Sequence, residues 1–170
     1  MGTRLRAILG SALFLVLAPG VIAGFVPWSI TRWALHTPFA GYGPLRVLGI
    51  AFIAAGLPVV LEAFARFALQ GLGTPAPVAP TKRLVVQGSF RYVRNPIYIA
   101  VLLLVAGQAL LFASAGLAVY AALLAAAFHA FVLAYEEPTL RRTFGADYDA
   151  YCAGVRRWLP RLGPWHGDRP

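Results

Sequence analysis

The chain has 170 residues, of which 59% are hydrophobic and only 12% are charged, with a formal net charge of +9. Soluble domains usually carry about twice that share of charged residues, so the composition indicates an integral membrane protein. A single cysteine, Cys152, excludes a disulfide framework and a thiolate metal cluster.

The first apolar stretch covers residues 7–30, which include no charged side chain. It slightly exceeds the roughly 20 residues that a helix needs to cross the hydrocarbon core. Arg4 and Arg6 precede it, which makes a signal peptide the alternative, but a signal h-region has only about 7–15 apolar residues. We therefore predict a membrane-spanning helix, kinked at Pro19 and Pro27.

Three further spans are predicted downstream. The second covers about residues 45–65. Residues 95–135 then contain no Asp, Glu, Lys or Arg, and this run is too long for one span. Its natural break is Ala-Ser-Ala-Gly at 113–116, which gives helices over about 97–113 and 117–135. The predicted fold is an all-α integral membrane domain with about four transmembrane helices.

The basic residues are distributed unevenly between the two ends of this predicted bundle. Thirteen of the 15 precede the first span, lie between the second and third spans, or follow the fourth. Only Arg32 and Arg46 lie between the first and second spans. The positive-inside rule then puts both termini and the 66–95 loop in the cytoplasm. Topology and contact with anionic lipid account for the charge, so no nucleic-acid partner is expected.

Two cytoplasmic segments complete a single membrane domain over residues 1–170. One is the loop 70–95, whose Gly- and Pro-rich opening cannot form a regular helix. The other is the tail 138–170, where Asp147 can cap a helix that starts after Gly145. Apolar and aromatic side chains recur in this tail at the spacing of one helical face; they are Leu140, Phe144, Tyr148, Tyr151 and Val155.

Few residues offer chemistry, because the chain has only six acidic side chains. Glu136 and Glu137 are adjacent at the cytoplasmic exit of the last predicted span, where a carboxylate is costly unless it is paired or solvated. They can form a salt bridge with Arg94 or Arg141. Alternatively, they can hold a cationic ligand group such as an α-ammonium.

The neighbours of this acidic pair add two expectations. Pro138 biases Glu137 away from α geometry, so we expect a bend that brings the tail back towards residues 88–98. His129 lies in mid-span, seven positions before Glu136, so both side chains project from one helix face about 10 Å apart. A hydrogen bond within the bundle and a role in a cavity are both open for this histidine.

The basic residues around the third span form a second group of candidates. Glu62 and Arg66 are spaced for a local ion pair at the end of the second span. Arg91 and Arg94 can make bidentate contacts to a carboxylate or phosphate, or can anchor in lipid headgroups. The Asn-Pro at 95–96 starts the third span, and a helix N-terminus below two arginines favours an anion.

Several sequence blocks recur in order around the two apolar helices of residues 95–135. The first two blocks are Gly73-Thr74-Pro75-Ala76-Pro77 and Leu84-Val85-x-x-Gly88-x-Phe90-Arg91-Tyr92-Val93-Arg94-Asn95-Pro96-x-Tyr98. The next two are Glu136-Glu137-x-x-Leu140-x-x-x-Phe144-Gly145-x-x-Tyr148-x-x-Tyr151 and Val155-Arg156-Arg157-Trp158-Leu159-Pro160. They resemble the isoprenylcysteine carboxyl methyltransferase family, whose wider superfamily includes phospholipid N-methyltransferases. Asn95 stands where that family often has His, and Arg156 replaces a Pro.

The resemblance implies S-adenosylmethionine as methyl donor, bound without a Rossmann fold or a metal between the membrane exit and a cytoplasmic C-terminal helix. Residues 1–69 would form two N-terminal spans, 70–160 the methyltransferase core and 161–170 a tail. The implied cofactor-binding residues are Arg94, Asn95, Pro96, Tyr98, Glu136, Glu137, Tyr148 and Tyr151. The implied catalytic residues are Arg91, Glu137 and Arg157. The Pro-rich loop would close this site on the cytoplasmic side of a bacterial-type inner membrane.

Methyl transfer from a sulfonium is an in-line displacement that needs alignment and the exclusion of water. A carboxylate acceptor needs no base and can be held by Arg91 or Arg157. An amine or a thiol must lose a proton, for which Glu62, Glu137 and His129 are candidates. The acceptor and the oligomeric state stay open, although a cavity between spans favours a lipophilic or lipid-borne acceptor. An NADPH-dependent sterol-type reductase and a non-catalytic membrane accessory protein are the alternative functions.

Overall fold

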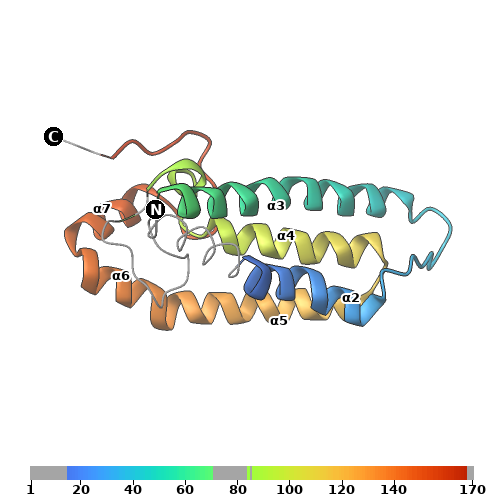
Figure 1. Ribbon diagram of the computed structural model, residues 1–170. Coiled ribbons are helices and arrows are strands. Elements are labelled where there is room, and N and C mark those ends of the chain that lie inside the picture. The colour runs from blue at the N-terminus through green and yellow to red at the C-terminus, as the bar shows by residue number, and fades with distance from the viewer. Residues whose placement is uncertain (1–14, 71–83, 85, 168–170) are drawn as a thin grey trace.

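The computed structural model describes residues 15–70, 84 and 86–167 (Figure 1). Every regular element within these ranges is helical, as predicted. Predictions on the remaining residues, among them the start of the first span and the Pro-rich loop, lie outside the described part of the chain. The elements are η1 (Val16–Phe25), α2 (Val26–Thr31), α3 (Gly43–Gln70), η2 (Gly88–Arg91), α4 (Pro96–Leu111), α5 (Ala115–Phe131), η3 (Val132–Glu136), α6 (Glu137–Phe144) and α7 (Ala146–Gly154).

The helices α3, α4 and α5 run side by side, with α4 in contact with both of the others (Figure 1). The N-terminal elements complete the bundle, because η1 packs on α4 and α2 packs on α5. Val60 and Phe64 of α3 meet Ala100 and Val101 of α4 in the buried core. This core packs α3 against the first turns of α4.

Two helical stretches are long and apolar enough to cross a membrane, Gly43–Arg66 and Ala115–Phe144. Leu17–Thr31 and Pro96–Leu111 are shorter apolar helices at the positions of the other two predicted spans. The helical class of the fold is therefore confirmed. Crossing by all four segments, and the direction of each, stay predictions.

The predicted break in the long apolar run is confirmed at residues 113–116. Helix α4 ends at Leu111, and Ala113 takes a left-handed conformation with φ 52°. Ser114 then caps α5, because its side chain accepts a hydrogen bond from the N–H of Leu117 at 3.2 Å. This tight connection makes α4 and α5 antiparallel neighbours.

Two prolines inside helical stretches are accommodated by π-helical turns. Pro19 lies within η1, and Pro138 comes just after η3. The predicted distortion at Glu137 is wrong, because this residue is helical with φ −61° and ψ −45°. Its N–H bonds to the carbonyl of Val132, five residues back, and this wider turn accommodates the proline ring. The helical stretch therefore continues from α5 into α6.

The chain turns back at Gly145 instead of at the proline. Gly145 has φ 51° and ψ −125°, a conformation that favours glycine. The predicted single helical face over 140–155 is therefore divided between α6 and α7. Tyr148 and Tyr151 still share one buried cluster with side chains of α6. Asp147 lies in the first turn of α7, whose cap is the glycine itself.

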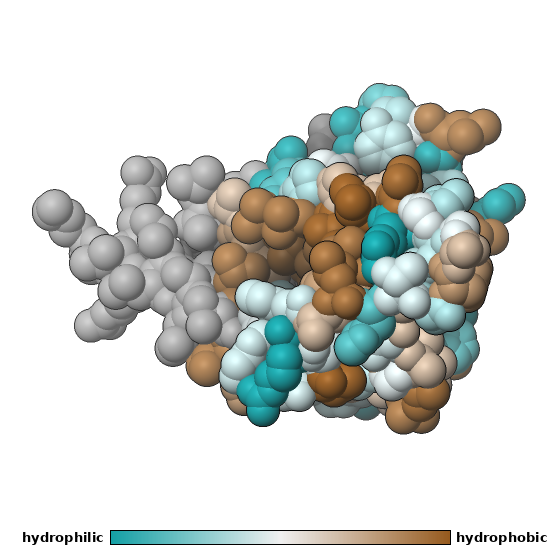
Figure 2. Space-filling model, turned by 90° about the vertical axis from the view of Figure 1, so that its right-hand side faces the viewer, coloured by the Kyte–Doolittle hydropathy of each residue, from teal (hydrophilic) through white to brown (hydrophobic). Residues whose placement is uncertain are grey.

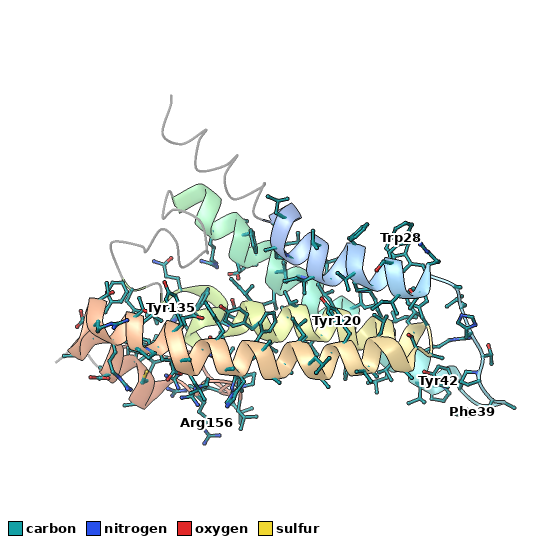
Figure 3. The ribbon with its side chains drawn as sticks, turned by 90° about the horizontal axis from the view of Figure 1, so that it is seen from below. Trp28, Phe39, Tyr42, Tyr120, Tyr135 and Arg156 are labelled. Atoms are coloured by element: carbon teal, nitrogen blue, oxygen red, sulfur yellow. The ribbon has the colours of Figure 1, made fainter. Side chains whose placement is uncertain are left out.

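Aromatic side chains lie at both ends of the bundle. Figure 2 shows apolar and hydrophilic residues intermixed on the end face that carries the α2–α3 connection, residues 32–42. Trp28 and Tyr42 lie at this end, whereas Tyr135 and Arg156 lie at the other (Figure 3). Aromatic side chains at both ends are typical of the two membrane–water interfaces.

Glycines let α3 and α4 approach closely. A Cβ atom on Gly107 would lie 2.7 Å from the carbonyl oxygen of Gly49, and one on Gly49 would lie 2.6 Å from that of Gly107. About two turns further along α3, a Cβ on Gly56 would lie 2.7 Å from the carbonyl oxygen of Ala100. Small residues at such contacts allow the backbones of membrane helices to pack directly.

Replacing one of these glycines should therefore destabilise the bundle. Gly107→Val is expected to lower the stability of the detergent-purified protein by about 1–3 kcal/mol, because the two backbones must separate. Gly24→Val is the matched control, since no other element of the described chain comes within 4 Å of a Cβ at Gly24. Equal thermal unfolding temperatures for the two variants would contradict this packing.

Candidate functional site

The polypeptide just before α4 is held by the C-terminal segment, residues 156–165. The N–H of Arg94 donates to the carbonyl of Arg156 at 3.0 Å, and the N–H of Arg161 donates to the carbonyl of Tyr92 at 2.9 Å. The two segments run antiparallel, although neither belongs to a sheet. Residues far apart in the sequence thus meet at one end of the bundle.

The start of α4 is fixed in the same way. The helix begins at Pro96 with Asn95 as its N-cap, as predicted. The proline suits this first position because its missing N–H has no partner there in any helix. The Asn95 side chain makes no cap and instead donates to the carbonyl of Arg157 at 3.2 Å. Asn95 is buried, so this bond ties the helix start to the C-terminal segment.

Glu137 is the centre of an ionic cluster. Arg157 grips its carboxylate with two bonds, Nε to Oε1 at 2.5 Å and Nη2 to Oε2 at 2.9 Å. Arg94 approaches the same Oε1, with its Nη1 at 3.3 Å. Glu137 is only 8% exposed. The hydrogen bonds that Arg157 donates to this carboxylate raise the pKa of Arg157, so the guanidinium stays charged.

Arg94 reaches further than this ion pair. Its Nη1 also donates to the sulfur of Cys152 on α7 at 2.6 Å. Its Nε is buried and has no hydrogen-bond partner among the described residues. A buried guanidinium nitrogen without a partner is unfavourable, so the site has an unused donor for an anionic or carbonyl group.

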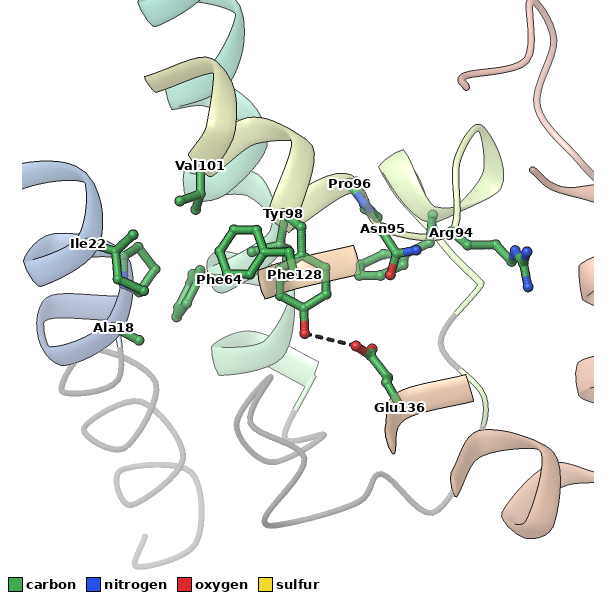
Figure 4. Close-up of a pocket in the computed structure, with 13 residues that line it drawn as sticks. Ala18, Ile22, Phe64, Arg94, Asn95, Pro96, Tyr98, Val101, Phe128 and Glu136 are labelled. Carbon is green, nitrogen blue, oxygen red and sulfur yellow. Dashed lines mark hydrogen bonds between the residues drawn. The ribbon is translucent and has the colours of Figure 1, made fainter. Parts of the chain in front are cut away.

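Glu136 points away from this cluster, into a cavity (Figure 4). Its Oε2 accepts a hydrogen bond from the Tyr98 hydroxyl at 2.8 Å. The tyrosine ring packs on Phe128 of α5, with ring centroids 4.6 Å apart. Adjacent positions on a helix point about 100° apart, which explains why Glu136 and Glu137 face different partners.

The cavity has a volume of about 180 Å³ and lies between η1, α3, α4 and α5. Its apolar wall includes Ala18, Ile22, Phe64 and Val101 (Figure 4). Its polar end is formed by Arg94, Asn95, Tyr98 and Glu136. An apolar cavity with a few convergent polar groups is the usual form of a small-molecule site.

Tyr148 and Tyr151 do not line this cavity. They are 2% and 3% exposed in the cluster formed by α6 and α7, and burial raises the pKa of both phenols. The Tyr151 hydroxyl donates to the carbonyl of Phe90 at 2.6 Å. Tyr151 therefore holds the segment before α4, and Tyr148 packs in the same buried cluster as Tyr151.

Arg91 is not brought together with Arg94. Its Nε donates to the carbonyl of Trp165 at 2.7 Å, and it lines a separate cavity with Arg66. The predicted anion grip by the two arginines is therefore not formed. The predicted ion pair of Glu62 and Arg66 is present, but neither residue lines the cavity that Glu136 faces.

Sequence reasoning missed the partners that only tertiary contact reveals. His129 forms a hydrogen bond, as one of its two interpretations proposed, and its Nδ1 accepts from Trp158 Nε1 at 3.0 Å. Cys152 gave no signal of its contact with the arginine cluster. Phe128 lies eight positions before Glu136, and both line the same cavity.

The sequence matches the model of a family described as phospholipid methyltransferase over residues 45–147. This match covers more than half of the chain. The chain belongs to the phospholipid methyltransferase family. The matched range runs from α3 into α7, so it includes the start of α4 and both glutamates. No curated protein and no solved structure matches the chain.

The two adjacent glutamates of this family member provide a matched test of the ionic cluster. Glu137→Gln should lower the stability of the protein in detergent by about 2 kcal/mol, because the bidentate Arg157 loses a charged acceptor. Glu136→Gln should change it much less, since an amide oxygen still accepts from Tyr98. Thermal unfolding of both variants measures the difference, and equal losses would contradict the assigned partners.

Proposed function

We propose that this protein transfers a methyl group from S-adenosylmethionine to a lipophilic or lipid-borne acceptor. The observation that carries the proposal is the cavity in which an apolar wall leads to the Tyr98–Glu136 pair, beside the cluster of Arg94, Glu137 and Arg157. The family match supports methyl transfer as the reaction. The acceptor and the donor are our inference from the groups present.

The residues at the polar end suit the donor. Its α-ammonium and ribose hydroxyls call for a carboxylate, which Glu136 supplies at the cavity wall. Its carboxylate calls for a cationic donor, and the buried Nε of Arg94 is available among the described residues. When bound, S-adenosylmethionine supplies an electrophilic methyl group on a positively charged sulfur. The cavity has a volume of about 180 Å³. This volume suits the reacting ends of the methyl donor and the acceptor, but not the whole of either molecule.

Glu137 then has an organising role in this proposal. Its carboxylate is already occupied by two guanidinium groups, so it has little capacity for a further cation. It orients Arg94 towards the cavity and holds Arg157 at the end of α7. Asn95 and Pro96 fix the start of α4, and Tyr148 and Tyr151 fix the backbone around it.

The same contacts favour one proton acceptor. Glu62 is paired with Arg66 and accepts from Ser89, and His129 accepts from Trp158. Glu136 is the carboxylate that faces the cavity, and within the described ranges its hydrogen-bond partner is Tyr98. We infer that it accepts the proton if the acceptor is an amine or a thiol.

The surroundings of Glu136 also favour the alignment of the two reactants. Phe64, Val101 and Phe128 exclude water from the reacting centre, which an in-line displacement requires. The positive-inside rule supports a cytoplasmic location of this end, because Arg32 and Arg46 are the arginines at the opposite end. A soluble methyl donor then enters from the cytoplasm and the acceptor from the bilayer.

Ligand binding tests the donor site directly. S-Adenosylhomocysteine at 100 times its dissociation constant should stabilise the detergent-purified protein by about 2.7 kcal/mol. Arg94→Ala should remove this stabilisation, because the buried donor is lost. Arg66→Ala is the control, since Arg66 lies outside the cavity, and it should bind as the parent protein does.

The same titration separates the alternatives. Stabilisation by a nicotinamide dinucleotide alone would favour a reductase, and stabilisation by neither ligand would favour a non-catalytic protein. Normal binding of S-adenosylhomocysteine by Arg94→Ala would overturn the site assignment while leaving the reaction class open.

The apolar wall yields a second prediction about the acceptor. Ala18→Phe should narrow the cavity and raise the KM of a lipophilic acceptor about tenfold or more, because an apolar group no longer fits. Leu17→Phe is the matched control, since the neighbouring Leu17 is 60% exposed. A labelled-methyl transfer assay against lipid extracts and prenyl-cysteine analogues measures both. Equal KM values for the two variants would exclude the cavity as the acceptor site.

A further inference from the structure

The C-terminal segment contacts α5 at Trp158. Trp158 donates to His129 at 3.0 Å, and the two rings lie 6.0 Å apart. His129 is seven positions before Glu136, so this contact lies about 10 Å along the helix from the membrane exit. Figure 3 shows Arg156 on this side of α5, extending away from the bundle.

This part of the segment exposes large apolar side chains next to arginines. Leu159 is 63% exposed and Leu162 is 107% exposed. Arg156 and Arg161 are exposed between and beside them, and Trp158 is half-buried. Leucines exposed to this extent are unfavourable in water. Arginines interleaved with leucine and tryptophan are typical of segments that lie in the headgroup layer of a membrane.

We propose that residues 156–162 form an interfacial anchor that binds the anionic phospholipid headgroups of the membrane in which the bundle lies. The depth of the Trp158–His129 contact agrees with the roughly 5–10 Å by which interfacial segments enter the headgroup and acyl boundary. At this depth Leu159 and Leu162 meet acyl chains, and the guanidinium groups meet phosphates.

Charge complementarity selects an anionic lipid as the occupant. The Arg156 side chain makes no hydrogen bond or ion pair with a described residue. Arg161 donates from its Nη1 to the carbonyl of Gly154 and makes no ion pair among the described residues. Glu137 is already occupied by Arg157 and Arg94. Two guanidinium groups therefore have no ion-pair partner within the described part of the chain, and an anionic headgroup can supply the counter-charge.

Lipid binding at this anchor also bears on the start of α4. The backbone carbonyl of Arg156 accepts from the N–H of Arg94, and that of Arg157 accepts from Asn95. A lipid that holds the segment in place thus stabilises the same backbone from which the site is built. The anchor itself goes beyond the proposed methyl transfer and does not depend on it.

A lipid titration tests the anchor. The full chain in detergent micelles is titrated with dioleoyl-phosphatidylglycerol or dioleoyl-phosphatidylcholine, which have the same acyl chains, and thermal stability is followed. Phosphatidylglycerol should bind more tightly. Arg156→Gln should weaken its binding about fivefold, the effect of one arginine at an anionic membrane surface. This substitution removes no contact within the described residues, so the variant should fold.

Arg142→Gln is the matched control, because Arg142 is exposed on α6 at the same end of the molecule but lies outside the segment. It should change lipid binding less than twofold. Equal binding of the two lipids, or equal losses for Arg142→Gln and Arg156→Gln, would overturn the proposal. Binding of S-adenosylhomocysteine by Arg156→Gln tests the methyl-donor site separately, so the two failures are distinguishable.

The depth of the segment provides a second measurement. A spin label on Leu162→Cys, in a Cys152→Ser background, is placed in vesicles of phosphatidylglycerol and phosphatidylcholine. Its accessibility to oxygen relative to a water-soluble nickel complex should indicate the headgroup boundary. A label as accessible to the nickel complex as one on Arg142→Cys would place the segment in water and refute the anchor.

Discussion

The bidentate contact between Arg157 and Glu137 is the interaction on which this end of the molecule depends. It joins the first residue of α6 to the segment that follows α7, and Arg94 extends it to the start of α4. Breaking a buried ion pair leaves an uncompensated charge, which costs more than the pair contributes. Because these three chain segments share no sheet, the ionic cluster and the backbone bonds beside it fix their relative positions.

The separation of the two glutamates follows from this contact. Once Glu137 faces the arginines, helix geometry turns Glu136 towards the start of α4. There it meets Tyr98 at the polar end of the cavity. One carboxylate thus pairs with two arginines, and the other lines the cavity. Two adjacent acidic residues can thus lie in two different environments, one an ion-pair cluster and the other a cavity.

The sequence predicts features that depend on local chemistry. Hydropathy and the Ala-Ser-Ala-Gly break define α4 and α5, and Pro96 marks a helix start in any context. The failures involve geometry that local rules do not contain. Pro138 is tolerated because η3 widens the preceding turn, and Gly145 interrupts a regular periodicity by its positive φ. The spacing of Arg91 and Arg94 suggests a common face only in a helix, whereas η2 ends between them.

The described acidic residues gather towards one end of the bundle. Of the six acidic residues, five lie in the described part of the chain, and all five are on the C-terminal half of α3 or beyond α5. Four of them have assigned partners, which are Arg66 for Glu62, Tyr98 for Glu136, Arg157 for Glu137 and Arg141 for Asp149. Carboxylates cannot lie in hydrocarbon without such partners. The opposite end has arginines and aromatic rings, which suit an interface, and no described carboxylate. The described carboxylates therefore lie at the end of the bundle where arginine or tyrosine side chains can donate hydrogen bonds to them.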